Sequence, residues 1–100
     1  MFDFSRIEGF EWDDGNSRKS LDKHAVSQRD AEEVFQDARL LVLQDDRHSQ
    51  SEARFHAYGL TTVGRRLCVT FTLRQNATMV RVISARAMSR RERARYEEEA

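Results

Sequence analysis

The chain has 100 residues, with 17 basic and 17 acidic side chains and a formal net charge of zero, which indicates one small domain over residues 1–100. It holds no run of about 18 apolar residues and no signal-peptide core, so neither a membrane span nor secretion is expected. The single cysteine, Cys68, excludes an internal disulfide and a cysteine-based metal site. We therefore expect a cytoplasmic protein without a cofactor, in which residues 1–8 form a loosely ordered leader.

The zero net charge hides an asymmetry between the two halves of the chain. Residues 1–46 carry twelve Asp and Glu against six Lys and Arg, whereas residues 47–100 carry five against eleven. The halves therefore have net charges of −6 and +6. Fifteen of the 17 basic residues are Arg, whose planar guanidinium binds phosphate and carboxylate at two points. The second half is thus either a phosphate-binding surface or a set of solvated charges that reflect Arg-rich codon usage.

The first part of the chain predicts a short strand followed by two helices. The first helix begins after an aspartate that can cap it. The second begins at Ser27, where Asp30 lies three residues further on, as in a loose capping box. Apolar residues then recur at the i, i+3, i+4 spacing of an amphipathic helix. The expected elements are a strand at 10–12, a helix from Asp13 or Asp14 to about His24, and a helix of about ten residues from Ser27 to Asp37 or Ala38.

From Leu40 onward the apolar period changes to two, which predicts strands. The connections 60–65 and 75–77 have hairpin length, so the strands should form an antiparallel meander. Ser89 and Glu92 form a capping box for a last helix, which is so polar that we expect it to fray or to dock on a partner. The expected strands are 40–44, 53–58, 66–74 and 78–86, and the helix is 90–98. This order, β-α-α-β-β-β-β-α, defines an α+β domain in which two helices cover one face of a twisted antiparallel sheet of four to five strands.

Alternation along the strands assigns each side chain to one of two sheet faces. The apolar positions of 66–74 are expected under the helices, so Arg74 faces the other way. Phe55 and Ala57 match the apolar face, which places their polar neighbours on the open face with Arg74. These polar neighbours are Glu52, Arg54, His56 and Tyr58. The last strand is ambiguous, because either Arg81, or Ser84 with Arg86, joins the open face.

The residue types on the open face are those needed for metal-independent RNA cleavage. A base, Glu or His, takes the proton of the ribose 2′-hydroxyl, Arg neutralises the phosphorane, and an acid, His or Tyr, protonates the leaving 5′-oxygen. The alternative is a solvated sheet face with cross-strand ion pairs such as Glu52–Arg74. The pattern by itself leaves both interpretations open.

Two further basic groups lie outside this face. Lys23 and His24 close the first helix, where cations suit the helix dipole; the functional interpretation is a second contact to RNA. The arginines between 86 and 95 can bind a nucleic-acid backbone or pair with the glutamates at 97–99 at i, i+4 spacing. The three histidines have no metal-ligand spacing, so no metal site is expected.

Short motifs along the whole chain resemble the BrnT family of bacterial toxins. Their order and spacing cover about residues 9–97. The motifs are F-E-W-D (Phe10–Asp13), K-H-x-V-S (Lys23–Ser27), A-x-x-V-F-x-D (Ala31–Asp37), D-x-R-H (Asp45–His48), E-x-R-F (Glu52–Phe55), Gly59, G-R (Gly64–Arg65) and V-I-S-A-R-x-M-S-R-R-E-R-x-x-Y-E (Val82–Glu97).

This resemblance implies a ribonuclease toxin of a type II toxin–antitoxin module, with a fold similar to the RelE-type toxins. It implies a small antitoxin, BrnA, with a ribbon-helix-helix domain, in a complex that binds and represses its own operator DNA. We expect a 2:2 toxin–antitoxin heterotetramer, RNA as substrate and no membrane partner. The alternatives are a non-catalytic partner that only completes the repressor complex, and a stand-alone RNA-binding domain. The chain lacks helix-turn-helix and RNP signatures, which weakens the last.

The face assignment and the resemblance together predict a site. Arg54 and Arg74 are expected to bind the scissile phosphate, and Glu52 or a histidine is expected to act as base. The expected catalytic residues are Glu52, Arg54, Arg74, Arg86 and His48, and the expected substrate-binding residues are Lys23, His24, Arg81, His56 and Tyr58.

Overall fold

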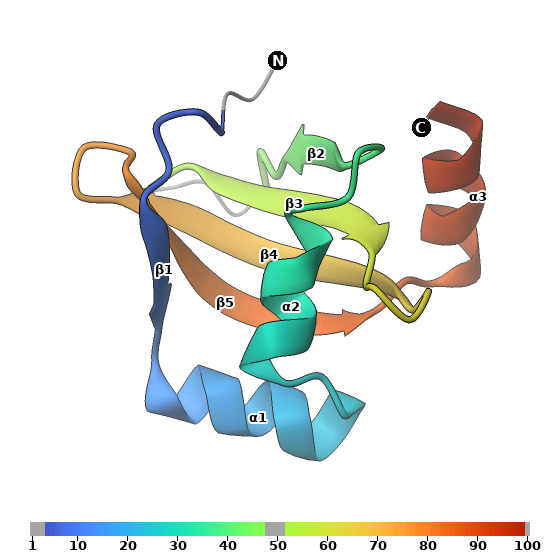
Figure 1. Cartoon of the computed structure of the whole chain (residues 1–100), viewed down its shortest axis with the longest axis horizontal. Helices are drawn as coiled ribbons and strands as arrows, with labels where there is room; N and C mark the ends of the chain where they lie inside the picture. The colour runs from blue at the N-terminus through green and yellow to red at the C-terminus, as the bar shows by residue number, and fades with distance from the viewer. Residues whose placement is uncertain (1–3, 48–51, 100) are drawn as a thin grey trace.

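A computed structural model describes residues 4–47 and 52–99 of the chain. Five strands form one sheet in the order β1-β5-β4-β3-β2, with three helices around it (Figure 1). The elements in chain order are β1 (Gly9–Trp12), α1 (Asp14–His24), α2 (Gln28–Val34), β2 (Leu41–Gln44), β3 (Arg54–Leu60), β4 (Arg66–Arg74), β5 (Met79–Ala87) and α3 (Arg90–Glu99). The predicted order of strands and helices is confirmed, and the fold is α+β.

The sheet is mixed, so the expectation of a purely antiparallel sheet is wrong. Strands β2 to β5 form the predicted antiparallel meander, but β1 pairs with β5 in parallel, with Gly9 opposite Met79 and Trp12 opposite Val82. Hairpin-length connections force neighbouring strands to run antiparallel, whereas β1 is separated from the meander by two helices and joins its far edge. The expectation of a RelE-like fold stays a prediction.

The capping residues found in the sequence begin the helices as predicted. Asp13 accepts a hydrogen bond from the Asn16 amide at 3.1 Å, and Ser27 and Asp30 form a reciprocal capping box at 3.1 and 3.2 Å. Helix α1 ends where Ala25 adopts a left-handed conformation, with φ of 54°. Helix α2 ends at Val34, earlier than expected. Within residues 4–47 and 52–99, no helix is long and apolar enough to cross a membrane.

The main core lies between the sheet and the layer formed by α1 and α2. Figure 1 shows α2 lying across the sheet and α1 running along β5. The Ser20 hydroxyl, which is buried, accepts a hydrogen bond from the Ala85 amide at 3.1 Å, so α1 satisfies backbone of β5 beyond the end of β1. The fully buried core side chains on this side are Val26, Ala31, Val34, Ala57, Leu67, Val69, Phe71, Val80, Val82 and Ala85. The predicted parity of β3 and β4 is therefore confirmed.

Aromatic rings fill the part of this core nearest to β1. Phe35, just after α2, packs edge to face against Phe10 and Phe71, with ring centroids 5.3 and 5.2 Å apart. Phe4 packs against the same ring at 5.5 Å. Edge-to-face pairs of this kind add about 0.5–1.5 kcal/mol to the burial of their area. They hold the segment before β1, α2 and the middle of the sheet together.

A bulge in β5 answers the question of which arginine joins the opposite sheet face. Thr70 is opposite Ser84 and Phe71 is opposite Val82, so Ile83 has no partner residue on β4. Val80 and Val82 point into the core before the bulge, and Ala85 does so after it. Both predicted alternatives therefore hold at once: Arg81 precedes the bulge on the opposite face, and Ser84 and Arg86 follow it there. We call this side, turned away from α1 and α2, the far face.

Helix α3 covers one end of the far face, so this helix has its own packing contacts. Tyr96 is 1% exposed and packs with Tyr58, Cys68 and Met88 in a second apolar cluster. The predicted capping box is present, because Glu92 accepts from the Ser89 amide at 2.8 Å and its own amide donates to the Ser89 hydroxyl at 3.2 Å. The sequence predicts a helix that frays or docks on a partner, whereas in the structure one aromatic residue anchors this otherwise charged helix on the sheet.

Asp37 joins the three parts of the molecule that meet beside α3. Its carboxylate accepts from the Leu60 amide at 2.8 Å and from the Tyr96 hydroxyl at 2.5 Å. Hydrogen bonds from these two groups and the Arg39 amide lower the pKa of Asp37 against its partial burial, which raises it. The approach is close because Gly59 has no side chain: a Cβ there would lie 3.0 Å from Val34 Cγ1 and 3.2 Å from the Asp37 carboxylate.

We predict that Gly59→Ala destabilises the fold, because the added methyl overlaps both side-chain and backbone atoms of Val34. The expected loss in the free energy of unfolding is about 1–3 kcal/mol, measured by urea denaturation. Gly9→Ala is the control, since its Cβ would meet only the flexible end of Met79, at 3.4 Å. Equal effects of the two substitutions would contradict the close packing of α2 on β3.

Candidate functional site

Three arginines surround Thr72 on the part of the far face that α3 leaves uncovered. Thr72 is opposite Arg54 on β3 and opposite Arg81 on β5, and Arg74 lies two residues further along β4. Neighbouring strands are about 4.8 Å apart and alternate residues of one strand about 6.8 Å. The three guanidinium groups therefore start from backbone positions within reach of one phosphate. We call Arg54, Arg74 and Arg81 the arginine cluster.

Carboxylates beside the arginine cluster balance its charge. Glu52 accepts from Arg74 Nη2 at 3.1 Å and from the Thr72 hydroxyl at 3.2 Å. Arg81 lies between Glu11 and Asp13, at the longer distances of 3.9 and 3.8 Å. The side chains of Arg74 and Glu52 are 41% and 43% exposed, and exposed ion pairs contribute little, about 0–1 kcal/mol each. A phosphate can therefore replace these carboxylates at small cost.

His56 lies in the next row of the far face, two residues along β3 from Arg54. Its Nε2 is 3.0 Å from Asp45 Oδ2, and its Nδ1 is 2.9 Å from the Thr70 hydroxyl. Both contacts fix the ring orientation, and an imidazolium can donate to both oxygen atoms. Sequence reasoning missed Asp45 and Thr70. Asp45 directly follows an apolar strand, and Thr70 shares the parity of Thr72, so the pairing register was the missing information.

Tyr58 and Cys68 belong to the covered end of the far face rather than to its open part. Both are buried under α3, with 8% and 1% exposure. Burial raises the pKa of the Cys68 thiol to about 11, and burial likewise raises the pKa of the Tyr58 hydroxyl. The thiol is therefore protonated at neutral pH and poorly nucleophilic. The expectation that Tyr58 binds substrate on an open face conflicts with this burial.

Arg86 is held by α3, which differs from the expected role in phosphate binding. Its guanidinium forms a two-point pair with Glu92, at 2.7 and 2.9 Å. Hydrogen bonding to Arg86 lowers the pKa of Glu92 to about 2, and the same contact raises the pKa of Arg86. Glu92 also caps α3, so one carboxylate joins the helix start to β5. The two-point pair between Arg86 and Glu92 therefore anchors α3 on the sheet.

Lys23 and His24 lie at the end of α1 with exposed side chains, away from the arginine cluster. The structure brings this segment to Arg65, in the connection between β3 and β4. Arg65 Nη1 donates to the Ala25 carbonyl at 2.8 Å and lies 3.5 Å from Asp30, and its Nη2 is 3.4 Å from the His24 carbonyl. Two motifs that resembled the family, Lys23–Ser27 and Gly64–Arg65, therefore meet in a contact that closes α1.

The remaining expected site residue, His48, lies outside the described residues. Among residues 4–47 and 52–99, no group of three His, Cys, Asp or Glu side chains is arranged to hold a metal ion. The ionisable side chains on the uncovered part of the far face include those of the arginine cluster, Glu52 and His56.

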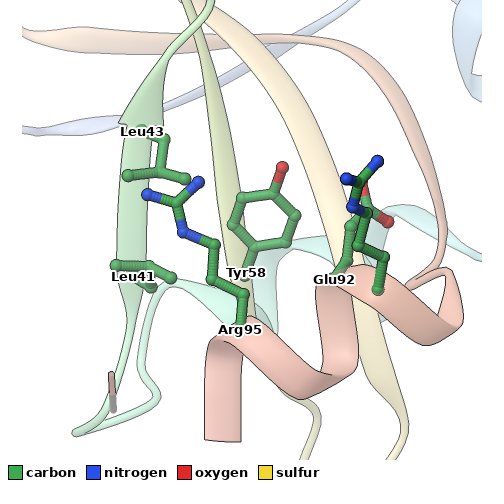
Figure 2. Close-up of a pocket in the computed structure, with 6 residues that line it drawn as sticks. Leu41, Leu43, Tyr58, Glu92 and Arg95 are labelled. Atoms are coloured by element: carbon green, nitrogen blue, oxygen red, sulfur yellow. The ribbon is translucent and has the colours of Figure 1, made fainter. Parts of the chain in front are cut away.

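A pocket of about 160 Å³ borders this polar face. Figure 2 shows Leu41 and Leu43 on one side, Tyr58 at the back, and Arg95 reaching from α3 toward β2. We call it the α3 pocket; its lining residues are Leu41, Leu43, Tyr58, Arg91, Glu92 and Arg95. Leu43 is opposite His56 in the β2–β3 register, so the pocket lies directly beside the His56 row.

Comparison with solved structures finds a similar fold in a bacterial protein. The structure is similar to the 1.1 Å crystal structure of the Brucella abortus ribonuclease toxin BrnT, with a TM-score of 0.64 and 20% sequence identity. The alignment covers 84% of this chain and 100% of that one. No curated protein sequence matches the chain significantly.

The sequence profile of one family matches residues 12–92 and is described as "Ribonuclease toxin, BrnT, of type II toxin-antitoxin system". The chain therefore belongs to the BrnT family of ribonuclease toxins, and the resemblance found in its motifs is confirmed. Membership in this family implies an antitoxin partner.

We predict that Glu92→Gln loosens α3. The lowered pKa of Glu92 means that its ion pair stabilises the fold fully above pH 4.5 and loses this contribution as the pH falls toward about 2. At pH 7 the expected loss in the free energy of unfolding is about 1.5–3 kcal/mol. Urea denaturation should show the variant and the wild type converging as the pH is lowered through that range. Glu98→Gln, on the exposed side of α3, is the control, and a constant difference at all pH values would contradict the assignment.

Proposed function

We propose that this chain is a metal-independent endoribonuclease that cleaves RNA and thereby inhibits translation and growth. The observation that carries the proposal is the arginine cluster around Thr72, with Glu52 and His56 beside it on the uncovered part of the far face. Family membership supports the same reaction class. Most arginines elsewhere on the described sheet and hairpin serve structural contacts, which makes this cluster the better phosphate site.

In the proposed mechanism the arginine cluster binds the scissile phosphate and the charge that develops on it. Arg54 and Arg81 approach from the two strands that flank Thr72, and Arg74 approaches from one end. Guanidinium groups suit this role because they present paired donors to phosphate oxygens. The Cys68 thiol, the buried Tyr58 and Arg86, which is paired with Glu92, take no part in the proposed reaction.

Glu52 is the proposed general base and His56 the proposed general acid. Glu52 takes the proton of the ribose 2′-hydroxyl, the 2′-oxygen attacks phosphorus, and the bond to the 5′-oxygen breaks as His56 protonates that oxygen. The products are a 2′,3′-cyclic phosphate and a free 5′-hydroxyl. Thr72 orients Glu52 when Arg74 turns to the phosphate, and Asp45 orients His56 through Nε2 while Nδ1 exchanges the Thr70 hydroxyl for the leaving oxygen. After product release, His56 regains a proton from solvent and Glu52 gives its proton to solvent.

The proposed cellular role follows from the family. A cognate antitoxin, of the BrnA type with a ribbon-helix-helix domain, neutralises the toxin, and the 2:2 complex binds and represses its operator in the cytoplasm. The alternative is a non-catalytic partner that only completes this repressor complex. The carboxylates already paired with Arg74 and Arg81 are the observation that favours the alternative.

We predict that Arg74→Ala and Arg81→Ala each lower the rate of RNA cleavage by about 10²–10³, because each removes one charged contact to the transition state. The measurement is single-turnover cleavage of a labelled RNA by the purified toxin. Arg29→Ala is the matched control, since Arg29 is 89% exposed on α2, on the other side of the sheet. Circular dichroism establishes that each variant is folded.

Three results would argue against this assignment. Full activity of both variants would move the site away from the arginine cluster. Loss of activity in Lys23→Ala together with retention in Arg74→Ala would place the substrate along the α1 end instead. Absence of cleavage by the wild type, together with operator binding by the toxin–antitoxin complex, would support the non-catalytic alternative.

A further inference from the structure

The α3 pocket combines an apolar floor with a positively charged rim. Leu41 and Leu43 are partly buried members of the cluster under α3, and both share the far-face parity of their partners on β3. Arg91 and Arg95 are exposed on α3 and flank the opening. Neither the proposed phosphate site nor the proposed proton transfers use this pocket.

The two rim arginines keep their charge available to a partner. Glu92 also lines the pocket, but its carboxylate is committed to Arg86 on β5. Arg95 pairs with Glu99 at 3.2 Å, with the two side chains 57% and 46% exposed, so this pair is weak. Within residues 4–47 and 52–99, Arg91 has no ion pair. A carboxylate that approaches the rim therefore displaces only the weak pair between Arg95 and Glu99.

Strand β2 adds an edge of the sheet to this surface. It is the last strand of the sheet and pairs only with β3 within the described residues. Its four residues, Leu41–Gln44, carry the leucines of the pocket. An extended peptide can pair with such an edge through its backbone and place alternate side chains in a neighbouring pocket.

From this combination we infer that the α3 pocket and the β2 edge bind an acidic segment of the antitoxin that carries a central apolar side chain. The apolar side chain enters between Leu43 and Tyr58, and flanking carboxylates pair with Arg91 and Arg95. The inference rests on the proposed function for the identity of the partner. The size and the charge of the pocket specify the segment: one aliphatic or aromatic residue with acidic neighbours.

The position of the pocket explains how such a segment neutralises the toxin. Leu43 is opposite His56, and the His56 and Tyr58 rings have centroids 6.3 Å apart. A segment that leaves the β2 edge at Leu43 and places its apolar side chain against Tyr58 therefore crosses onto the far face, over His56 and toward Arg54, two residues along β3. Bound there, the segment keeps RNA away from His56, the proposed general acid. It does so without contact to the far end of the arginine cluster.

The test is the affinity of the purified toxin for its cognate antitoxin, measured by calorimetry, together with RNA cleavage in the absence of antitoxin. The test variant reverses both rim charges, Arg91→Glu with Arg95→Glu, at exposed positions that should leave folding intact. Arg93→Glu, on the same helix but outside the pocket, is the matched control. Leu43→Ala tests the apolar floor separately.

We expect the double reversal to weaken antitoxin binding by about 30-fold or more, with unchanged RNA cleavage and little effect of Arg93→Glu. Unchanged antitoxin affinity in the double reversal would overturn the inference. If RNA cleavage also falls in the double reversal, the α3 pocket binds RNA instead. If self-association of the free toxin changes, the pocket binds a second copy of this chain instead. Failure of the proposed function would appear differently, as wild-type toxin that binds antitoxin but does not cleave RNA.

Discussion

The two-point pair between Arg86 and Glu92 determines how the far face is divided. Because one carboxylate both caps α3 and holds β5, the helix is fixed over the end that contains Tyr58 and Cys68. Together with Tyr96, which is buried and hydrogen-bonded to Asp37, this pair holds an otherwise charged helix on the sheet. The covered end is thereby shielded from solvent, and the remaining end keeps the charged groups in contact with solvent. The α3 pocket lies at the boundary between the two parts.

On the open part of the far face, nearby carboxylates balance the charges of the arginines. Guanidinium groups on neighbouring strands repel each other unless carboxylates are nearby, and Glu52, Glu11 and Asp13 supply that balance. These pairs are exposed or long, whereas the Arg86 pair is short and two-pointed. The difference separates the arginines that we propose to exchange a protein carboxylate for an RNA phosphate from Arg86, which stays paired with Glu92. The number and length of the ion-pair contacts, rather than residue type, therefore distinguish the arginines of the candidate site from Arg86.

Much of the fold could be predicted from local signals. The capping residues Ser27 and Ser89 act within one helical turn, and the alternation of apolar residues in β4 indicates which of its side chains are buried. What the sequence could not supply was non-local. The direction of β1 depends on where the chain returns to the sheet, and the bulge at Ile83 depends on pairing with β4. The same limit applies to the site: Glu52 and Arg74 were found by parity, but Asp45 beside His56 and Glu92 on Arg86 required the packed structure.

The central claim is that the open part of the far face binds the RNA backbone. The most direct measurement is NMR chemical-shift mapping of the labelled toxin with a short RNA whose scissile ribose carries a 2′-O-methyl group, which blocks cleavage. The account predicts the largest changes in the backbone amides of Arg54, Thr72 and Arg81, with small changes in α1. Largest changes at Lys23, His24 and Arg65, with Thr72 unaffected, would contradict it.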